Sequence, residues 1–372
     1  MQFKDVIGQE GVKKHLVEEV SRNRISHAQL LLGNPGFGGL PIALAFAQYI
    51  LCSNRTETDS CGTCPSCQKV SQLQHPDLHF SFPTVLTLGS KSDLFLGNWR
   101  QKIKENPYFN LNQWTLTIDE KGRKPVIGTD ESQEIIKKLS LKSFEGGYKI
   151  MMIWMAEEMN TTCSNKLLKI LEEPPEKTLF ILLVENADSI LPTILSRTQL
   201  VKLNRIPDDL IKNELKTRFN LNEQAAASQA ALANGDWVEA LELSGEHQQK
   251  DINRELFVQC MRVCYKKDVI AMIQWAEKMA SVTKEDQKNF LRYALHMFRQ
   301  SILNNYVGDQ MTRVSEEEAD FLKNFSRFIT GNNIQEFMKE FSDAHYHLER
   351  NANAKILFTD LCFKVMRYIH FA

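Results

Sequence analysis

The sequence lacks the features that would assign the protein to a membrane, secreted or strongly charged class. None of its apolar runs approaches the roughly 20 residues that cross a bilayer, so we expect no membrane segment. No apolar core of a signal peptide follows residues 1–6, so we expect a cytoplasmic protein whose thiols stay reduced. The formal net charge of −1 gives no global electrostatic reason to bind nucleic acid or an anionic membrane.

A glycine-rich loop near the N-terminus has the spacing of a phosphate-binding loop but lacks its reactive side chains. Between two apolar runs, at 28–32 and 42–51, the loop carries Gly33, Gly36, Gly38 and Gly39. In the pattern G-x-x-x-x-G-K-[ST], a Lys contacts the β- and γ-phosphates and a Ser or Thr hydroxyl binds Mg²⁺. Gly39 and Leu40 occupy those two positions here. The loop therefore predicts a nucleotide fold that does not hydrolyse nucleotide.

Strands and helices alternate in the first part of the chain, and helices alone follow. Continuous apolar runs at 148–154 and 178–184 are typical of strands buried on both faces. A helical pattern at 160–171 separates them and ends before two prolines. This alternation indicates a parallel sheet with helices on both faces. The predicted division is an α/β domain at 1–206, a small helical domain at 207–247 and an all-α domain at 248–372.

Residues from about 84 to 125 interrupt the alternation without any sustained periodicity. They include Trp99, Trp114 and a polar turn at 119–123. We interpret this segment as an insertion, partly helical near 98–104. Two roles stay open at this point: an extra contact for a partner, or a surface elaboration.

Four of the eight cysteines lie close together in the sequence, at Cys52, Cys61, Cys64 and Cys67. Four thiolates in a short loop are the donors of a structural zinc site, and C-x-x-C turns supply them with little strain. We expect tetrahedral Zn²⁺ with no open position, and hence no catalysis there. The alternatives are four free thiols or a set completed by His75. The other four cysteines are expected to be small buried apolar groups: Cys163, Cys260, Cys264 and Cys362.

Five motifs in series resemble those of the clamp-loader AAA+ proteins of bacterial DNA polymerase III. They occupy residues 7–10 (Ile-Gly-Gln-Glu), 27–33, 61–67, 165–175 (ending Leu-Glu-Glu-Pro-Pro) and 195–198 (Leu-Ser-Arg-Thr). The resemblance is clear over about 1–80 and 127–245 and only architectural beyond. It implies an AAA+ parallel-sheet domain with a helical lid, followed by a helical-bundle collar domain.

The chain departs from the family pattern wherever the family carries out chemistry. An Asp-Glu pair of the family holds Mg²⁺ and activates water, and a lid arginine approaches the γ-phosphate. The aligned positions here hold Trp154, Met155 and Val238. Glu157 and Glu158 are out of register, and we interpret them as a solvated helix start. The resemblance thus implies no intrinsic ATPase activity, with the glycine loop as a vestige whose nucleotide binding is doubtful.

Arg197, after Ser196, is the residue that the resemblance assigns to a nucleotide in a neighbouring subunit. In the family this arginine crosses the subunit interface and contacts the γ-phosphate bound next door. A guanidinium there stabilises the charge that develops during phosphoryl transfer. The alternative is an arginine at a helix C-terminus, paired with the helix dipole or with a surface acid.

The function implied by the resemblance is a non-catalytic structural subunit that supports ATP-driven loading of the sliding clamp on primed DNA. The implied partners are clamp-loader ATPase subunits and a delta-type subunit in a hetero-pentamer, the sliding clamp, and primer-template DNA through the complex. Two alternatives remain. An active motor ATPase is disfavoured by the missing Lys, hydroxyl and acidic pair, and a zinc-containing nucleic-acid-binding module by the near-zero net charge.

Overall fold

The computed structural model describes residues 1–244, 247–307, 316–349 and 352–370. The chain forms two compact units. The first comprises Met1–Arg218 and Ala233–Leu241, and the second Phe219–Leu232 and Glu242–Ala372. In the described residues the first unit contains the sheet and the second is helical. None of the described helices is long and apolar enough to cross a membrane.

The first unit is built on a five-stranded parallel sheet with the strand order β2-β3-β4-β1-β5. The strands are β1 (Ala28–Leu32), β2 (Leu78–Ser81), β3 (Lys149–Trp154), β4 (Thr178–Val184) and β5 (Gln199–Lys202). β3 and β4 are buried over their whole length, which explains their continuous apolar sequences. All five carboxyl ends meet at one edge of the sheet, where open parallel sheets place their ligand sites.

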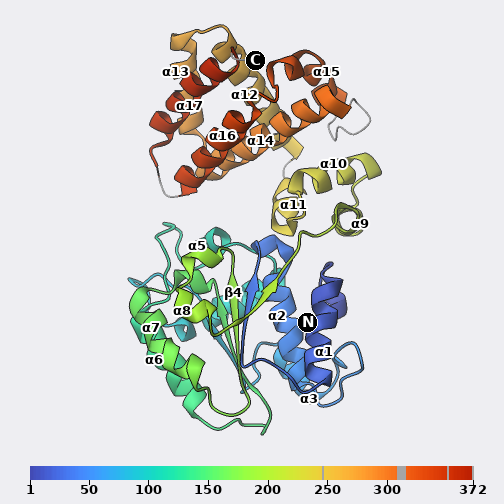
Figure 1. Cartoon of the computed structure of the whole chain (residues 1–372), viewed down its shortest axis with the longest axis vertical. Coiled ribbons are helices and arrows are strands. Elements are labelled where there is room, and N and C mark those ends of the chain that lie inside the picture. Colours follow the sequence, from blue (N-terminus) through green and yellow to red (C-terminus); the bar gives the residue numbers. More distant parts are fainter. Residues whose placement is uncertain (245–246, 308–315, 350–351, 371–372) are drawn as a thin grey trace. The chain divides into compact units, whose positions relative to one another are not determined.

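Helices cover both faces of the sheet. Figure 1 shows α1 (Glu10–Ser21), α2 (Gly39–Leu51) and α3 (Pro65–Ser71) on one side, and α6 (Thr129–Ser140) and α7 (Thr161–Glu172) on the other. Because successive strand residues face opposite sides, β3 sends Ile150 and Met152 into the core under α2, and Met151 and Ile153 into the core under α6 and α7. The doubly covered parallel sheet predicted from the sequence is confirmed.

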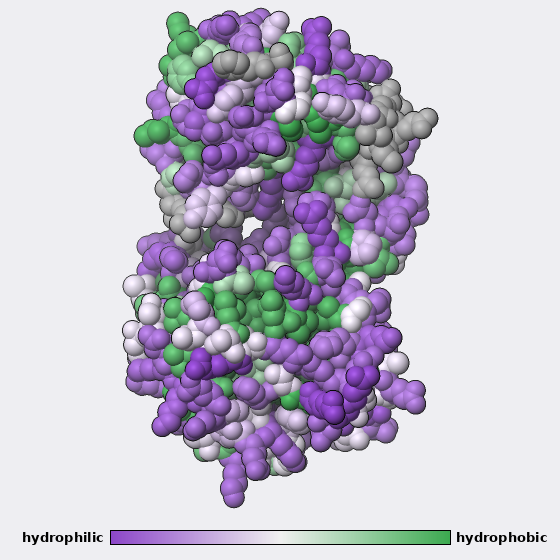
Figure 2. Space-filling view, viewed as in Figure 1, coloured by the Kyte–Doolittle hydropathy of each residue, from purple (hydrophilic) through white to green (hydrophobic). Residues whose placement is uncertain are grey.

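The insertion contributes to the first core. It forms η3 (Ser92–Phe95), α4 (Leu96–Glu105) and α5 (Leu111–Ile118), so the predicted helix near 98–104 is confirmed. Trp99 and Trp114 are completely buried, with ring centroids 5.1 Å apart, and Trp99 stacks on Phe82 at 4.3 Å. The two tryptophans are thus core residues. Apolar side chains also gather on the surface of this unit, where Figure 1 places α5, and Leu116 of that helix is half exposed (Figures 1 and 2).

The first unit also contains η1 (Phe3–Asp5), η2 (Pro35–Phe37), η4 (Ala156–Glu158), η5 (Ala187–Ser189), α8 (Pro192–Leu195), nearly all of α9 (Asp208–Phe219) and the first part of α11 (Trp237–Ser244). The residues at 190–196 have the pattern of a helix, but the helix in the structure is only the four residues of α8. The reason is that Pro192 supplies the N1 position of α8, so the helix begins later than the apolar pattern suggests.

The second unit contains α10 (Glu223–Ala233), α12 (His247–Tyr265), α13 (Val269–Ser281), α14 (Lys284–Val307), α15 (Glu316–Phe325), η7 (Ser326–Phe328), α16 (Ile334–Glu349) and α17 (Ala354–Tyr368). Phenylalanines dominate its core: Phe257, Phe290, Phe298, Phe337, Phe341 and Phe358 are all fully buried. The predicted all-helical C-terminal region is confirmed, while the three-part domain division stays a prediction.

Candidate functional site

The glycine loop lies between β1 and α2, at the carboxyl edge of the sheet. Gly38 is the N-cap of α2 with φ +90°, in the left-handed region that glycine adopts without strain. Several loop amides are already bonded within the protein. The N–H of Gly33 donates to Val184 O at 3.0 Å, that of Phe37 to Asn34 O at 2.9 Å, and that of Gly38 to Pro35 O at 3.3 Å. These three amides therefore do not point freely toward a phosphate site.

Apolar side chains fill the space beside the loop where a nucleotide phosphate would lie. The remaining cavity has a volume of about 20 Å³ and is lined by Gly33, Gly39, Phe109, Trp154 and Met155, among others. Small-molecule sites usually offer about 300–1,000 Å³. Trp154 and Met155 end β3 and are 3% and 5% exposed. Phe109 comes from the insertion, with its ring centroid 5.1 Å from that of Trp154.

Tyr108, also from the insertion, packs against the other side of the loop. Its hydroxyl oxygen accepts the N–H of Ile7 at 3.0 Å, and its side chain is almost completely buried. A Cβ added to Gly38 would lie 3.3 Å from Tyr108 Cε1. Asn106 fixes the turn by donating to Tyr108 O at 2.8 Å and accepting from Tyr108 N at 3.0 Å. Burial raises the pKa of Tyr108 to about 12, so its hydroxyl stays protonated at neutral pH.

The start of α11 closes the loop from a third side. A Cβ on Gly36 would overlap the Asp236 carboxylate and lie 2.7 Å from Trp237 N. Asp236 is held in place because its carboxylate accepts the N–H of Glu239 at 3.1 Å. Val238, at the position of the family's lid arginine, is buried. The loop is thus enclosed by β3, the insertion and α11.

Glu157 and Glu158 lie in the first turn of a short helix, so the predicted helix start is confirmed, but the expectation that they are solvated is wrong. Glu157 and Glu158 form part of η4 and both are half-buried. Glu157 Oε1 accepts the N–H of Glu185 at 2.7 Å, just beyond the end of β4. Burial raises the pKa of Glu157 to about 7. The sequence missed this because the contact joins residues 28 positions apart.

The four clustered cysteines come together as the spacing predicts, and none is in a disulfide. Their sulfurs all lie within 4.8 Å of one another. The Sγ–Sγ distances are 3.5 Å for Cys52–Cys61 and 3.9 Å for both Cys52–Cys64 and Cys61–Cys67. Tetrahedral Zn²⁺ with Zn–S bonds of about 2.3 Å places its sulfurs about 3.8 Å apart. The cluster therefore has the dimensions of a metal site.

Backbone amides point at these sulfurs, as a thiolate site requires. The N–H of Cys61 lies 3.4 Å from Cys52 Sγ, that of Cys64 3.3 Å from Cys61 Sγ, and that of Cys67 3.4 Å from Cys64 Sγ. The N–H groups of Thr63 and Cys64 lower the pKa of the Cys61 thiol. Such donors stabilise the negative charge that four thiolates would bring to a divalent cation.

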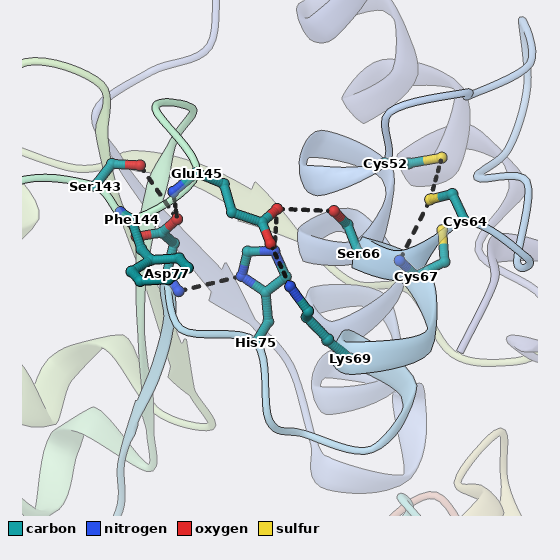
Figure 3. Close-up of polar contacts among 10 residues, drawn as sticks. All are labelled: Cys52, Cys64, Ser66, Cys67, Lys69, His75, Asp77, Ser143, Phe144 and Glu145. Atoms are coloured by element: carbon teal, nitrogen blue, oxygen red, sulfur yellow. Dashed lines mark hydrogen bonds and ion pairs between the residues drawn. The ribbon is translucent and has the colours of Figure 1, made fainter.

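His75 does not belong to the cysteine set, because both its ring nitrogens have other partners. Nδ1 accepts the N–H of Asp77 at 3.1 Å, and Nε2 lies 3.1 Å from a carboxylate oxygen of Glu145 (Figure 3). Glu145 also accepts from Ser66 Oγ at 2.9 Å and Lys69 Nζ at 2.7 Å on α3. Lys69 and Ser66 hold the pKa of Glu145 at about 2. The cysteine module is thereby tied to the segment that precedes β3.

Arg197 lies at the opposite edge of the sheet from the glycine loop. It precedes β5 by two residues, while Gly33 follows the end of β1, and β1 and β5 run parallel in register. With about 3.3 Å per strand residue, the two sites are separated by more than about 10 Å. Arg197 Nη1 donates to Thr193 O at 2.8 Å and lies 3.2 Å from Ser196 Oγ, and Nη2 pairs with Glu172. The Arg197 side chain is 32% exposed and lies beyond the end of α7.

Comparison with known proteins found the following similar proteins. The family model described as "DNA polymerase III, delta subunit" matches residues 8–207. DNA polymerase III subunit delta' of Escherichia coli is 24% identical over 357 residues, covering 95% of this chain and 93% of that protein. The subunit delta' of Yersinia pestis is 31% identical over 184 residues, covering 50% of this chain and 43% of its own length. A gamma-subunit-related protein of Thermotoga maritima superposes with a TM-score of 0.37 at 14% identity, over 97% of this chain and all of that one.

Proposed function

This chain belongs to the DNA polymerase III delta-prime family of clamp-loader proteins, and from that premise we propose that it is a non-catalytic structural subunit of a clamp loader. The AAA+ fold class expected from the sequence is confirmed with the family. In the proposed role, the chain completes a ring with ATPase subunits and a delta-type subunit. It supports their ATP-driven loading of the sliding clamp on primed DNA and hydrolyses no nucleotide itself.

The observation that carries this proposal is the closed nucleotide site. A cavity of about 20 Å³ remains beside the loop, against the several hundred that a nucleoside triphosphate needs. Four chemical groups are also replaced. Gly39 and Leu40 stand for the Lys and the hydroxyl, and Trp154 and Met155 for the acidic pair. Opening the pocket would therefore still leave these four positions without the groups that bind phosphate and Mg²⁺ and activate water.

Arg197 is the group that we propose this chain gives to a neighbour. Its distance from the chain's own glycine loop excludes a contribution in cis, and its exposure leaves it accessible to another subunit. The contacts with Thr193 O and Glu172 hold the guanidinium in one orientation before any partner binds. An arginine fixed in this way loses less side-chain entropy when it meets a phosphate.

The cysteine module is proposed to hold a structural Zn²⁺ through Cys52, Cys61, Cys64 and Cys67. The sulfur spacing and the amide donors support zinc, and four sulfur ligands leave no open position for substrate. Its role is then to fix α3, whose Ser66 and Lys69 bind Glu145. In this proposal the zinc site is structural and takes no part in nucleotide hydrolysis.

A reconstitution experiment tests the proposal. The purified chain alone is expected to show no ATP turnover, and its addition to cognate ATPase and delta-type subunits should give turnover stimulated by clamp and primed DNA. Arg197→Ala should lower that stimulation by about 10³-fold or more at the site it serves, the range of a trans arginine. Assembly of the complex, measured by size-exclusion chromatography, should be unchanged.

The matched control is Arg22→Ala, which removes another exposed arginine that pairs with a glutamate on the same unit. It should leave the stimulated turnover unchanged. ATP hydrolysis by the isolated chain would overturn the non-catalytic role. Full stimulation by an assembled Arg197→Ala complex would overturn the arginine assignment and leave the structural role standing.

A further inference from the structure

Three cysteines of the second unit lie together in its helical core. Cys260 and Cys264 are one turn apart on α12, and Cys362 is on α17. Their three sulfurs lie within 4.8 Å of one another, and all three side chains are completely buried. None of the three is in a disulfide. From the sequence, each cysteine is expected to be an isolated apolar group. The fold brings Cys362 next to Cys260 and Cys264, which lie about 100 positions earlier.

The surroundings of this trio differ from those of the zinc-type cluster. The three cysteines belong to the core that contains Phe257, Trp275 and Phe358. The Cys264 thiol donates to Cys362 O at 3.4 Å. Among the described residues, no backbone N–H donates to these three sulfurs, because the helical ladders use those amides. The first cluster has three such donors.

Any ion that the three thiolates bind must therefore form with them a complex of nearly zero net charge. All three side chains are completely buried among apolar residues, and Cys264 lies in the last turn of α12, where the helix dipole opposes negative charge. An unpaired charge in an apolar core is very unfavourable. Three thiolates around Zn²⁺ leave a charge of −1 and an unfilled fourth position, and around Cu⁺ they leave −2. Three thiolates around a trivalent centre leave none.

We propose that Cys260, Cys264 and Cys362 form a binding site for a trivalent thiophilic metalloid, arsenic(III) or antimony(III), held as a neutral tris-thiolate. With arsenous acid, three As–S bonds replace three As–O bonds. The three thiol protons leave with the three hydroxide groups as water, and no atom changes oxidation state. The three-coordinate product needs no fourth ligand, which suits an apolar pocket. Binding crosslinks α12 to α17.

The test uses the full, zinc-loaded chain, reduced with a phosphine and refolded from mild denaturant in equimolar arsenite so that the buried thiols are reached. Native mass spectrometry should show one arsenic per chain with the loss of three protons. Bound zinc should stay constant, and the thermal midpoint of the second unit should rise, because the crosslink constrains its unfolded state. Cys163 is a buried cysteine on α7 of the first unit, so Cys163→Ala is the matched control and should behave as the parent chain.

Removal of one trio member should abolish the three-proton product and the rise in thermal midpoint. Cys362→Ala and Cys260→Ala provide two such variants, so that a folding defect in one leaves the other. Three results would overturn the proposal: equal arsenic binding by a folded trio variant, zinc release in proportion to arsenic bound, or no arsenic retained after refolding.

Discussion

Tyr108 provides the sharpest test of how the nucleotide site is closed. Its hydroxyl accepts the buried N–H of Ile7 at 3.0 Å, and Tyr108→Phe removes that acceptor while keeping the ring. A buried donor left without a partner costs about 1–3 kcal/mol. Tyr108→Ala also removes the ring from its contact with Gly38, and truncation of a buried aromatic side chain costs about 3–5 kcal/mol. Tyr108→Ala should therefore destabilise the first unit more than Tyr108→Phe does.

Urea unfolding followed by tryptophan fluorescence measures this effect, because four of the five tryptophans lie in the first unit: Trp99, Trp114, Trp154 and Trp237. The midpoint should fall for Tyr108→Phe and further for Tyr108→Ala. Tyr306→Phe, at a tyrosine that is 73% exposed, is the control and should stay within about 0.5 kcal/mol. An unchanged midpoint for Tyr108→Phe, with less than about 1 kcal/mol lost in Tyr108→Ala, would refute the packed-plug reasoning.

Three further predictions concern the same unit. Gly36→Ala should cost about 1–3 kcal/mol in urea unfolding because its Cβ would displace the start of α11, whereas Gly11→Ala, with open space around it, should be neutral or stabilising; equal effects would contradict the closure by α11. The raised pKa of Glu157 favours its protonated form in the folded state, so stability should fall as pH rises from about 4.5 to 7, by up to about 3 kcal/mol, and Glu157→Gln should flatten this slope in urea midpoints measured across that range. Removal of zinc with a chelator, or Glu145→Gln, should speed hydrogen exchange at residues 143–145 and leave that of α7 unchanged. Unchanged exchange at 143–145 would show that the cysteine module does not stabilise this segment.

The sequence predicts those parts of the fold that depend on local pattern. The apolar runs of β3 and β4, the glycine spacing and the C-x-x-C turns all have a periodicity or spacing that fixes the structure nearby. Contacts across long separations were not accessible. Tyr108 meets Ile7 across 101 positions and Glu145 meets His75 across 70. The insertion has no periodicity, so nothing in its sequence indicated that Trp99 lies in the core.

The carboxyl edge of the sheet shows why the character of single residues there is hard to predict from the sequence. At the carboxyl edge, Trp154 and Met155 are buried apolar side chains, and their burial stabilises the end of β3. Glu157 lies at this edge too, and its solvation was predicted wrongly. A glutamate read as solvated is half-buried, because the end of β4 supplies an N–H for its carboxylate.

Arg197 and the glycine loop, at opposite edges of one sheet, give the chain a direction. In a head-to-tail array, each subunit presents one edge to the neighbour before it and the other edge to the neighbour after it. A subunit with an arginine at one edge and a filled pocket at the other can contribute to hydrolysis of a neighbour's nucleotide, but it holds no nucleotide for its other neighbour to contact. If Arg197 has the proposed role, an array that contains this chain has fewer nucleotide-hydrolysing sites than subunits, because this chain contributes an arginine but no site of its own.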